Sequence, residues 1–214
     1  MPMKYTHIIW DWNGTLLDDI GASLASVNDM LAARGEPPMG KERYKECIGT
    51  PIIRFYEQVF DLEKEDYPSI LAEYNAGYMR HLEACGLTEG AERAIEIFAA
   101  AGLHQAIVSS SNNVQLCGNA KRFGVFEKFE AVLGAADFNA DSKIERARKY
   151  LRENGGENGR VLVVGDLEHD AEMAAEIGAD CVLLTSGHEH PERLARSGAV
   201  IFDKIDELIL FVQN

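Results

Sequence analysis

The sequence has few cysteines and no long apolar run. Its four cysteines lie far apart and form no C-x-x-C pair, so neither a zinc knuckle nor a disulfide framework is indicated. No segment approaches the ~18 apolar residues of a membrane span. The first residues contain no apolar region typical of a signal peptide. We therefore expect a cytoplasmic protein with reduced thiols and no membrane contact.

Basic residues are also scarce. Lys and Arg number 21 against 35 Asp and Glu, which gives a formal net charge of −14. Such a surface repels nucleic acid, so we expect none as a partner. It repels anionic substrates too, and a phosphate site would need a local cation, a lysine or backbone N–H groups. The hydrophobic fraction of 46% is ordinary for a globular protein and suffices for a core.

Short apolar runs predict the strands of a buried parallel sheet, because continuous apolar residues are typical of strands covered on both faces. The runs are residues 8–10, 106–108, 131–133, 161–164, 181–184 and 200–202. Helical patterns separate them, over residues 91–101, 113–123, 142–153 and 168–177. The alternation of strand and helix predicts an α/β fold, a doubly wound Rossmann-like parallel sheet.

One segment interrupts this alternation, because between residues 18 and 85 we find only helical patterns. They cover residues 20–34, 41–48, 52–60 and 67–84. Four helices after a single strand are too many for one face of a sheet. The sequence therefore predicts an inserted all-α domain, residues 18–85, within a core formed by residues 1–17 and 86–214.

The first predicted strand runs into Asp11-Trp12-Asn13-Gly14-Thr15-Leu16. Ligands of open α/β sheets bind beyond the carboxyl ends of the strands, where Asp11 is expected. Gly14 permits a sharp turn, and the Thr15 hydroxyl can bond a phosphoryl oxygen or the loop itself. On its own, this hexapeptide is equally typical of a capped strand-to-loop turn.

A second motif, Gly165-Asp166-Leu167-Glu168-His169-Asp170, follows the strand predicted at 161–164. It places Asp166 at a strand end and Asp170 one helical turn later. Carboxylates so arranged suit Mg²⁺, which prefers oxygen ligands. Helix capping by Asp166 is the simpler explanation of this motif taken alone.

Two further features complete the set. Ser109, Ser110, Ser111 and Asn112 end a predicted strand just before a helix, where hydroxyls and free N–H groups can cradle a phosphate. Helix N-capping is the alternative there. Lys143 lies near the start of a helix, where its charge opposes the helix dipole unless it meets a phosphate or carboxylate.

Together and in this order, the four motifs resemble the haloacid dehalogenase-like hydrolase superfamily, in its phosphoglycolate phosphatase and β-phosphoglucomutase branch. That pattern has a strand ending in D-x-D-G-T-L/V, a second ending in Ser or Thr, a Lys, and G-D-x-x-x-D. The matching positions are Asp11, Ser109, Lys143, Asp166 and Asp170. The resemblance covers nearly the whole chain, and the helical insert is similar to the C1-type cap of this family.

The resemblance implies a phosphatase of small phosphate esters in which Asp11 attacks phosphorus and forms an aspartyl-phosphate. It implies that Mg²⁺ is held by the side chains of Asp11, Asp166 and Asp170 and by the backbone carbonyl of Asn13. The implied phosphate-binding residues are Thr15, Ser109, Ser110 and Lys143. The cap would close over the site, exclude water and select the leaving group.

One position departs from the family pattern. Asn13 stands where these phosphatases have a second Asp, which serves as their general acid and base. An amide cannot carry out that role, which is worth ~10²–10⁴-fold in rate. The sequence leaves three alternatives open: a slow enzyme, substitution by Asp18, Asp19 or His169, or a chain that binds phosphate esters without turnover. A phosphomutase is a further alternative to the phosphatase.

Four other features have plain structural interpretations. Asp18-Asp19 is expected to begin the first helix of the insert, where acidic side chains complement the dipole. His188-Glu189-His190 is expected in a solvated loop. We expect Trp12 to pack near the cap hinge and Arg54 to lie on an exposed helix face.

Overall fold

A six-stranded parallel sheet forms the centre of the computed structural model, which describes residues 3–135 and 142–213. The sheet order is β5-β4-β1-β6-β7-β8. The strands are β1 (His7–Trp10), β4 (His104–Asn112), β5 (Ala131–Ala135), β6 (Val161–Gly165), β7 (Asp180–Leu184) and β8 (Val200–Phe202). The chain starts in the middle and winds first to one edge, then to the other. The predicted doubly wound sheet and its six strands are confirmed.

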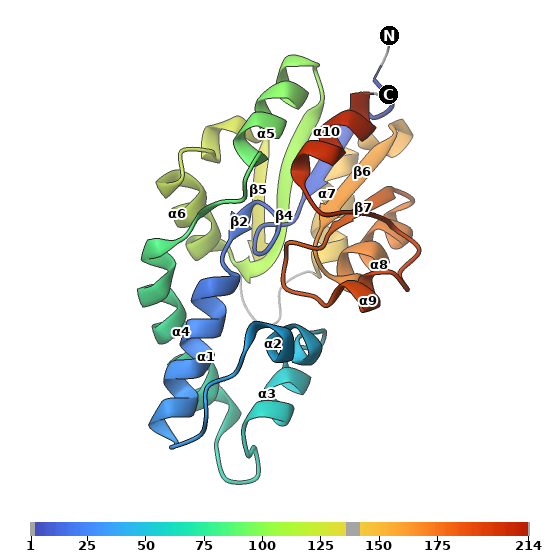
Figure 1. Ribbon diagram of the computed structural model, residues 1–214. Coiled ribbons are helices and arrows are strands. Elements are labelled where there is room, and N and C mark those ends of the chain that lie inside the picture. The colour runs from blue at the N-terminus through green and yellow to red at the C-terminus, as the bar shows by residue number, and fades with distance from the viewer. Residues whose placement is uncertain (1–2, 136–141, 214) are drawn as a thin grey trace.

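Helices cover both faces of this sheet (Figure 1). Along β1, Ile8 and Trp10 pack toward α5 (Ala91–Ala100), α6 (Asn113–Arg122) and α10 (Ile205–Gln213). Ile9 points to the other face and packs with α7 (Lys143–Glu153) and α8 (Glu168–Ile177). Because successive side chains point to opposite faces, a strand covered on both sides must be apolar throughout.

The inserted segment forms a separate group of helices beyond the carboxyl ends of the strands (Figure 1). Its helices are α1 (Ile20–Ala33), α2 (Lys41–Cys47), α3 (Ile53–Val59) and α4 (Tyr67–His81), followed by a 3₁₀ turn, Leu82–Ala84. They share a hydrophobic cluster that includes Tyr44, Phe55 and Tyr56. We call residues 18–85 the cap; its status as an independent domain stays a prediction.

The chain enters and leaves the cap through a short antiparallel ladder that the sequence did not indicate. It joins β2 (Leu17–Asp18) to β3 (Gly86–Leu87). Two other elements were also not predicted, α9 (Pro191–Leu194) and the C-terminal α10. The helix expected to reach Ala84 is α-helical only as far as His81. Within the described ranges, no helix is long and apolar enough to cross a membrane.

Candidate functional site

Three buried carboxylates meet at the carboxyl edge of the sheet. Asp11 follows β1, Asp166 follows the neighbouring strand β6, and Asp170 lies in the first turn of α8. Each offers an oxygen, and these oxygens all lie within 4.8 Å of one another. Parallel strands end at a common edge, so two motifs 155 residues apart in sequence converge here. The grouping predicted from the sequence is present.

Lys143 lies between two of these carboxylates. Its Nζ donates to Asp11 Oδ1 over 2.5 Å and to Asp170 Oδ1 over 2.6 Å. A capping box holds the helix start that carries it, because Ser142 and Glu145 each bond the other's backbone N–H. The pKa of Lys143 is raised: burial opposes its charge, but the two carboxylates outweigh burial. The positive charge of Lys143, which is unfavourable at a helix N-terminus, thus meets carboxylates, one of the two kinds of partner considered from the sequence.

Backbone and hydroxyl donors fix the other two carboxylates. Asp170 Oδ2 accepts from the N–H groups of Asp166 and Leu167 at 3.2 and 3.1 Å. Asp166 accepts from the Thr15 hydroxyl at 3.1 Å and from the His188 N–H at 2.6 Å. Asp166 therefore does not cap α8, whose N-cap is Leu167. The Thr15 hydroxyl bonds the carboxylate after β6 and not its own loop, so the loop-internal option among its predicted roles is wrong.

Burial and mutual repulsion disfavour the ionised forms of Asp11 and Asp166. Burial raises the pKa of Asp11 to about 6, against the opposing effect of Lys143. Burial, with Asp11 and Asp170 nearby, raises the pKa of Asp166 to about 8, against the opposing effect of His188. Lys143 and His188 thus do not fully offset burial and repulsion, and the cluster can accept further positive charge. A divalent cation with oxygen ligands fits this set of donors.

Two glycines let the backbone approach Asp166 closely. A Cβ at Gly187, or at Gly14 with its φ of +70°, would overlap the Asp166 carboxyl group. The Gly14 turn thereby brings the loop after β1 against the end of β6. The shape of the carboxylate cluster depends on these two positions.

The serines at the end of β4 occupy different environments. Ser109 is buried, with its Oγ accepting from the Ser111 N–H at 3.2 Å. Ser110 is exposed. Asn112 caps α6 by accepting from the N–H groups of Val114 and Gln115, as the capping interpretation expected. Ser109 and Ser110 stay predicted phosphate-binding residues, of which Ser109 faces the protein interior.

Asp19 has a different role from the one predicted. It precedes α1 but forms no side-chain capping bond to that helix. Its carboxylate instead accepts from Asn13 Nδ2 at 2.7 Å and from the Gly14 N–H at 2.8 Å. Burial opposes ionisation, but the charge and hydrogen bond of His188 with the bonds from Asn13 and Tyr78 lower the pKa of Asp19. Of the three proposed substitutes for a second acid–base group, Asp18 is exposed and His169 pairs with Glu172.

The solvated loop expected at His188-Glu189-His190 is wrong for its first two residues, which are buried. His188 Nε2 lies 3.0 Å from Asp19 Oδ1, and Nδ1 lies 2.9 Å from the Tyr44 hydroxyl. Burial lowers the pKa of His188, but Asp19 outweighs it and raises that pKa to about 9. Glu189 accepts from the Glu168 N–H. The loop carries a cation into the site, and sequence reasoning missed it.

The same loop holds the cap against the core. Besides the bond between Tyr44 of α2 and His188, Lys45 Nζ donates to the Thr185 carbonyl over 2.9 Å. Arg193 also bonds the Ile48 carbonyl at the end of α2. The cap thus contacts the loop after β7 through one helix. Arg54 is exposed on α3, as expected.

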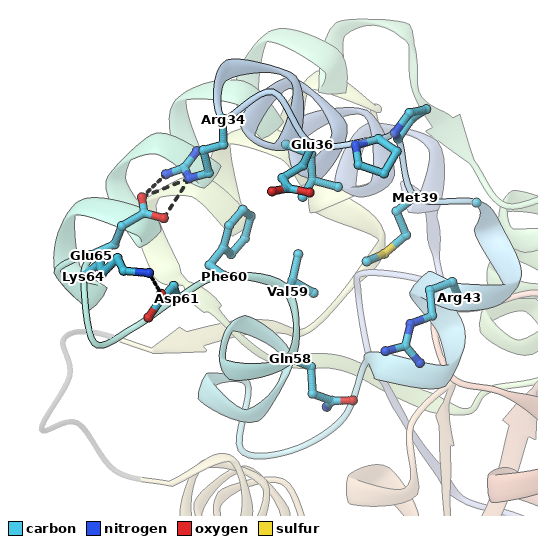
Figure 2. Close-up of a pocket in the computed structure, with 14 residues that line it drawn as sticks. Arg34, Glu36, Met39, Arg43, Gln58, Val59, Phe60, Asp61, Lys64 and Glu65 are labelled. Carbon is cyan, nitrogen blue, oxygen red and sulfur yellow. Dashed lines mark hydrogen bonds and ion pairs between the residues drawn. The ribbon is translucent and has the colours of Figure 1, made fainter.

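A cavity of about 790 Å³ lies elsewhere in the cap, between the α1–α2 and α3–α4 connections (Figure 2). Its charged side chains largely pair with one another, Arg34 with Glu65 and Lys64 with Asp61 (Figure 2). It contains none of the residues predicted for catalysis. The residues predicted for catalysis therefore lie outside this cavity, at or near the carboxylate cluster.

Comparison with known proteins agrees with this geometry. Residues 8–184 match the model of one family, described as haloacid dehalogenase-like hydrolase. The chain belongs to the haloacid dehalogenase-like hydrolase family. The matched range contains Asp11, Lys143, Asp166 and Asp170, so the carboxylate cluster and its lysine lie within the part shared with the family, whereas His188 lies beyond it.

Individual relatives are distant. The phosphoglycolate phosphatase of Rhodobacter capsulatus is 25% identical over 190 residues, 85% of this chain and 84% of that protein. The tyrosine-protein kinase PtkA of Mycobacterium bovis is 25% identical, covering 94% of this chain and 70% of that protein. A haloacid dehalogenase-like family hydrolase from Streptococcus pneumoniae superposes with a TM-score of 0.82 at 18% identity, covering 98% and 99%. The structural likeness supports the fold.

Proposed function

We propose that this protein is a Mg²⁺-dependent phosphatase that acts on a small phosphorylated metabolite through an aspartyl-phosphate on Asp11. The observation that carries the proposal is the contact of Lys143 Nζ with Asp11 and Asp170 beside Asp166. Family membership as a hydrolase and several relatives named phosphoglycolate phosphatase support it. A cytoplasmic location, expected from the sequence, is part of the proposal.

The chain supplies a nucleophile and the means to orient it. Lys143 fixes the Asp11 carboxylate and favours its ionised form, which is the form that attacks phosphorus. Ser109 and Lys143 are proposed to hold phosphoryl oxygens and to neutralise the charge that develops on them. Burial of Asp11 excludes water from the first step.

The proposed Mg²⁺ site consists of the carboxylates of Asp11, Asp166 and Asp170 with the backbone carbonyl of Asn13. When bound, the cation would neutralise phosphoryl charge and keep the clustered carboxyls ionised. Thr15 and the His188 N–H hold Asp166 in place for it. Lys143 already ties Asp170 to Asp11, so the ligand set is largely pre-formed.

Phosphate release from a panel of phosphorylated metabolites in Mg²⁺, beginning with phosphoglycolate, tests the proposal. The Asp11→Asn variant should release no phosphate above background. Glu153→Gln, which changes an exposed carboxylate at the far end of α7, should behave as the unaltered protein does. Equal phosphate release by Asp11→Asn and the unaltered protein would refute the nucleophile, and no release from any compound would refute the phosphatase.

A further inference from the structure

The side chain of Asn13 uses both of its amide N–H groups within the protein. Its Nδ2 donates to Asp19 Oδ2 over 2.7 Å and to the Tyr78 hydroxyl over 2.9 Å. Its Oδ1 accepts from the Ser111 hydroxyl over 2.6 Å. A carboxamide has two N–H groups, so none is left to bond a departing oxygen. An amide N–H is in any case not an acid.

The carboxylate next to Asn13 is equally occupied. Asp19 Oδ1 accepts from the Gly14 N–H at 2.8 Å and faces His188 Nε2 at 3.0 Å. Its Oδ2 accepts from Asn13 and from the Tyr78 hydroxyl, the latter at 2.7 Å. A carboxylate has about four lone-pair sites, and these four partners fill them. Asp19 is therefore held as an acceptor and has no free position from which to serve a substrate.

His188 is closed off in the same way, since its two ring nitrogens face Asp19 and Tyr44. Asp19, Tyr78 and His188, the groups next to Asn13 that can carry a proton, are thus engaged with one another. We infer that this phosphatase acts on phosphate compounds whose leaving group is acidic, namely aryl, enol or acyl phosphates. The inference rests on the proposed function and specifies its substrate class.

In this reaction the protein donates no proton to the leaving oxygen. An Asp11 oxygen bonds to phosphorus, the bond from phosphorus to the leaving oxygen breaks, and that oxygen departs with the electron pair as an anion. Water then bonds to phosphorus, the Asp11–phosphorus bond breaks, and the proton lost by the water passes to solvent. Inorganic phosphate and the Asp11 carboxylate are the products.

The basicity of the leaving oxygen determines how fast a substrate reacts without a proton donor. The conjugate acid has a pKa of about 4 for a carboxylate and about 10 for a phenolate. An alkoxide resembles hydroxide, for which the value is about 15.7. Phosphoglycolate releases an alkoxide and is therefore expected to be a slow substrate of this protein.

The experiment measures kcat/KM for substituted phenyl phosphates of graded leaving-group pKa, with phosphoglycolate and acetyl phosphate at the two extremes. In a loose transition state the leaving oxygen carries most of a negative charge. We expect kcat/KM to fall on the order of tenfold for each unit by which the leaving-group pKa rises. Each substrate is also measured with the Asp11→Asn variant, and the rates must be lost in that variant.

A charge-conserving exchange supplies the matched variant. The double substitution Asn13→Asp with Asp19→Asn exchanges the amide and the carboxylate between positions 13 and 19. The amide at position 19 can then donate to the carboxylate at position 13 and to Tyr78, and the Tyr78 hydroxyl can donate to position 13. The exchange places a carboxyl where Asn13 now stands, and we expect kcat/KM for phosphoglycolate to rise by roughly 10²-fold or more. For acetyl phosphate, whose leaving carboxylate needs no proton, we expect a much smaller rise, so the ratio of kcat/KM for phosphoglycolate to that for acetyl phosphate should increase. Asn13→Asp alone sets two carboxylates face to face and should not give this gain.

The outcomes are separable. A kcat/KM that does not vary with leaving-group pKa would overturn the inference and leave the phosphatase intact. Absence of Asp11-dependent phosphate release from every compound would instead remove the proposed function. The series on the unaltered protein decides the inference by itself, including the case in which the double variant does not fold.

Discussion

The Tyr44 hydroxyl of the cap lies 2.9 Å from Nδ1 of His188, a residue of the core whose other ring nitrogen faces Asp19. This contact joins a cap helix to the loop that also holds Asp166 through the His188 N–H. The position of the cap is therefore linked to the orientation of a proposed metal ligand.

Tyr44→Phe should loosen this link. It removes one buried hydrogen bond and leaves His188 Nδ1 without that partner, at a cost of about 1–3 kcal/mol. We expect a lower free energy of unfolding in urea and a KM several-fold higher. Tyr67→Phe, at the start of α4, is the control. Equal effects of the two substitutions on KM would contradict a special role for the Tyr44 contact.

Mg²⁺ should stabilise the protein more at about pH 8 than at about pH 5. Folded pKa values of about 6 for Asp11 and about 8 for Asp166 exceed their unfolded values near 3.8. The metal-free folded state therefore binds more protons than the unfolded chain in this range, and its stability falls as pH rises. Bound Mg²⁺ favours the ionised carboxylates and offsets that loss.

The measurement is the Tm with saturating Mg²⁺ minus the Tm in EDTA, taken at both pH values. In a domain of this size 1 kcal/mol moves Tm by about 2–4 °C, so a difference of several degrees is expected. Asp166→Asn serves as the control and should reduce the pH dependence of the Mg²⁺ effect to the part that comes from Asp11. An effect of Mg²⁺ that is constant across the range would contradict the assignment.

Gly187→Ala should damage the carboxylate cluster. The added Cβ would overlap the Asp166 carboxyl group, which hydrogen bonds from Thr15 and the His188 N–H prevent from moving freely. We expect Mg²⁺ affinity, followed by calorimetry, to fall at least about tenfold, as for disturbed ligand support. Gly118→Ala is the matched control: it lies in α6 with open space around it and should stabilise by about 0.5–1 kcal/mol.

The two tryptophans should respond differently to replacement by Phe. Trp10 Nε1 donates to Gln105 Oε1 over 3.0 Å, whereas buried Trp12 Nε1 has no hydrogen-bond partner among the described residues. Trp10→Phe leaves an unsatisfied acceptor and should cost about 1–3 kcal/mol more than Trp12→Phe. Urea unfolding of both variants checks this. A more stable Trp10→Phe protein would show that the Gln105 bond contributes little.

The central sheet and the carboxylate cluster were predictable because their sequence signals are local. A strand buried on both faces is apolar at every position, as in Val161–Gly165, and its end marks where Asp166 emerges. The order of the strands then brings Asp11 beside it. Lys143 was found through its unfavourable position at a helix start, since that position requires a negative partner.

The polar network around Asn13 was not predictable, because its members have no periodic signature. Tyr78 lies on a cap helix and His188 in a loop of the core, and only the docking of cap on core brings both next to Asp19. Asp19 was assigned to the nearest helix dipole for the same reason. The missed α10 is a different case, since Ile205, Leu208, Ile209 and Val212 have helical spacing that could have been recognised.

The strand order also governs when the site can exist during synthesis. Asp11 follows β1, but the neighbouring strand β6 and Lys143 come about 130 to 150 residues later in the chain. Until about residue 170 has left the ribosome, the proposed nucleophile has neither its ammonium contact nor the other two carboxylates. A nascent or truncated chain ending before β6 would therefore expose an inert Asp11, and the activity would appear only with the nearly complete polypeptide.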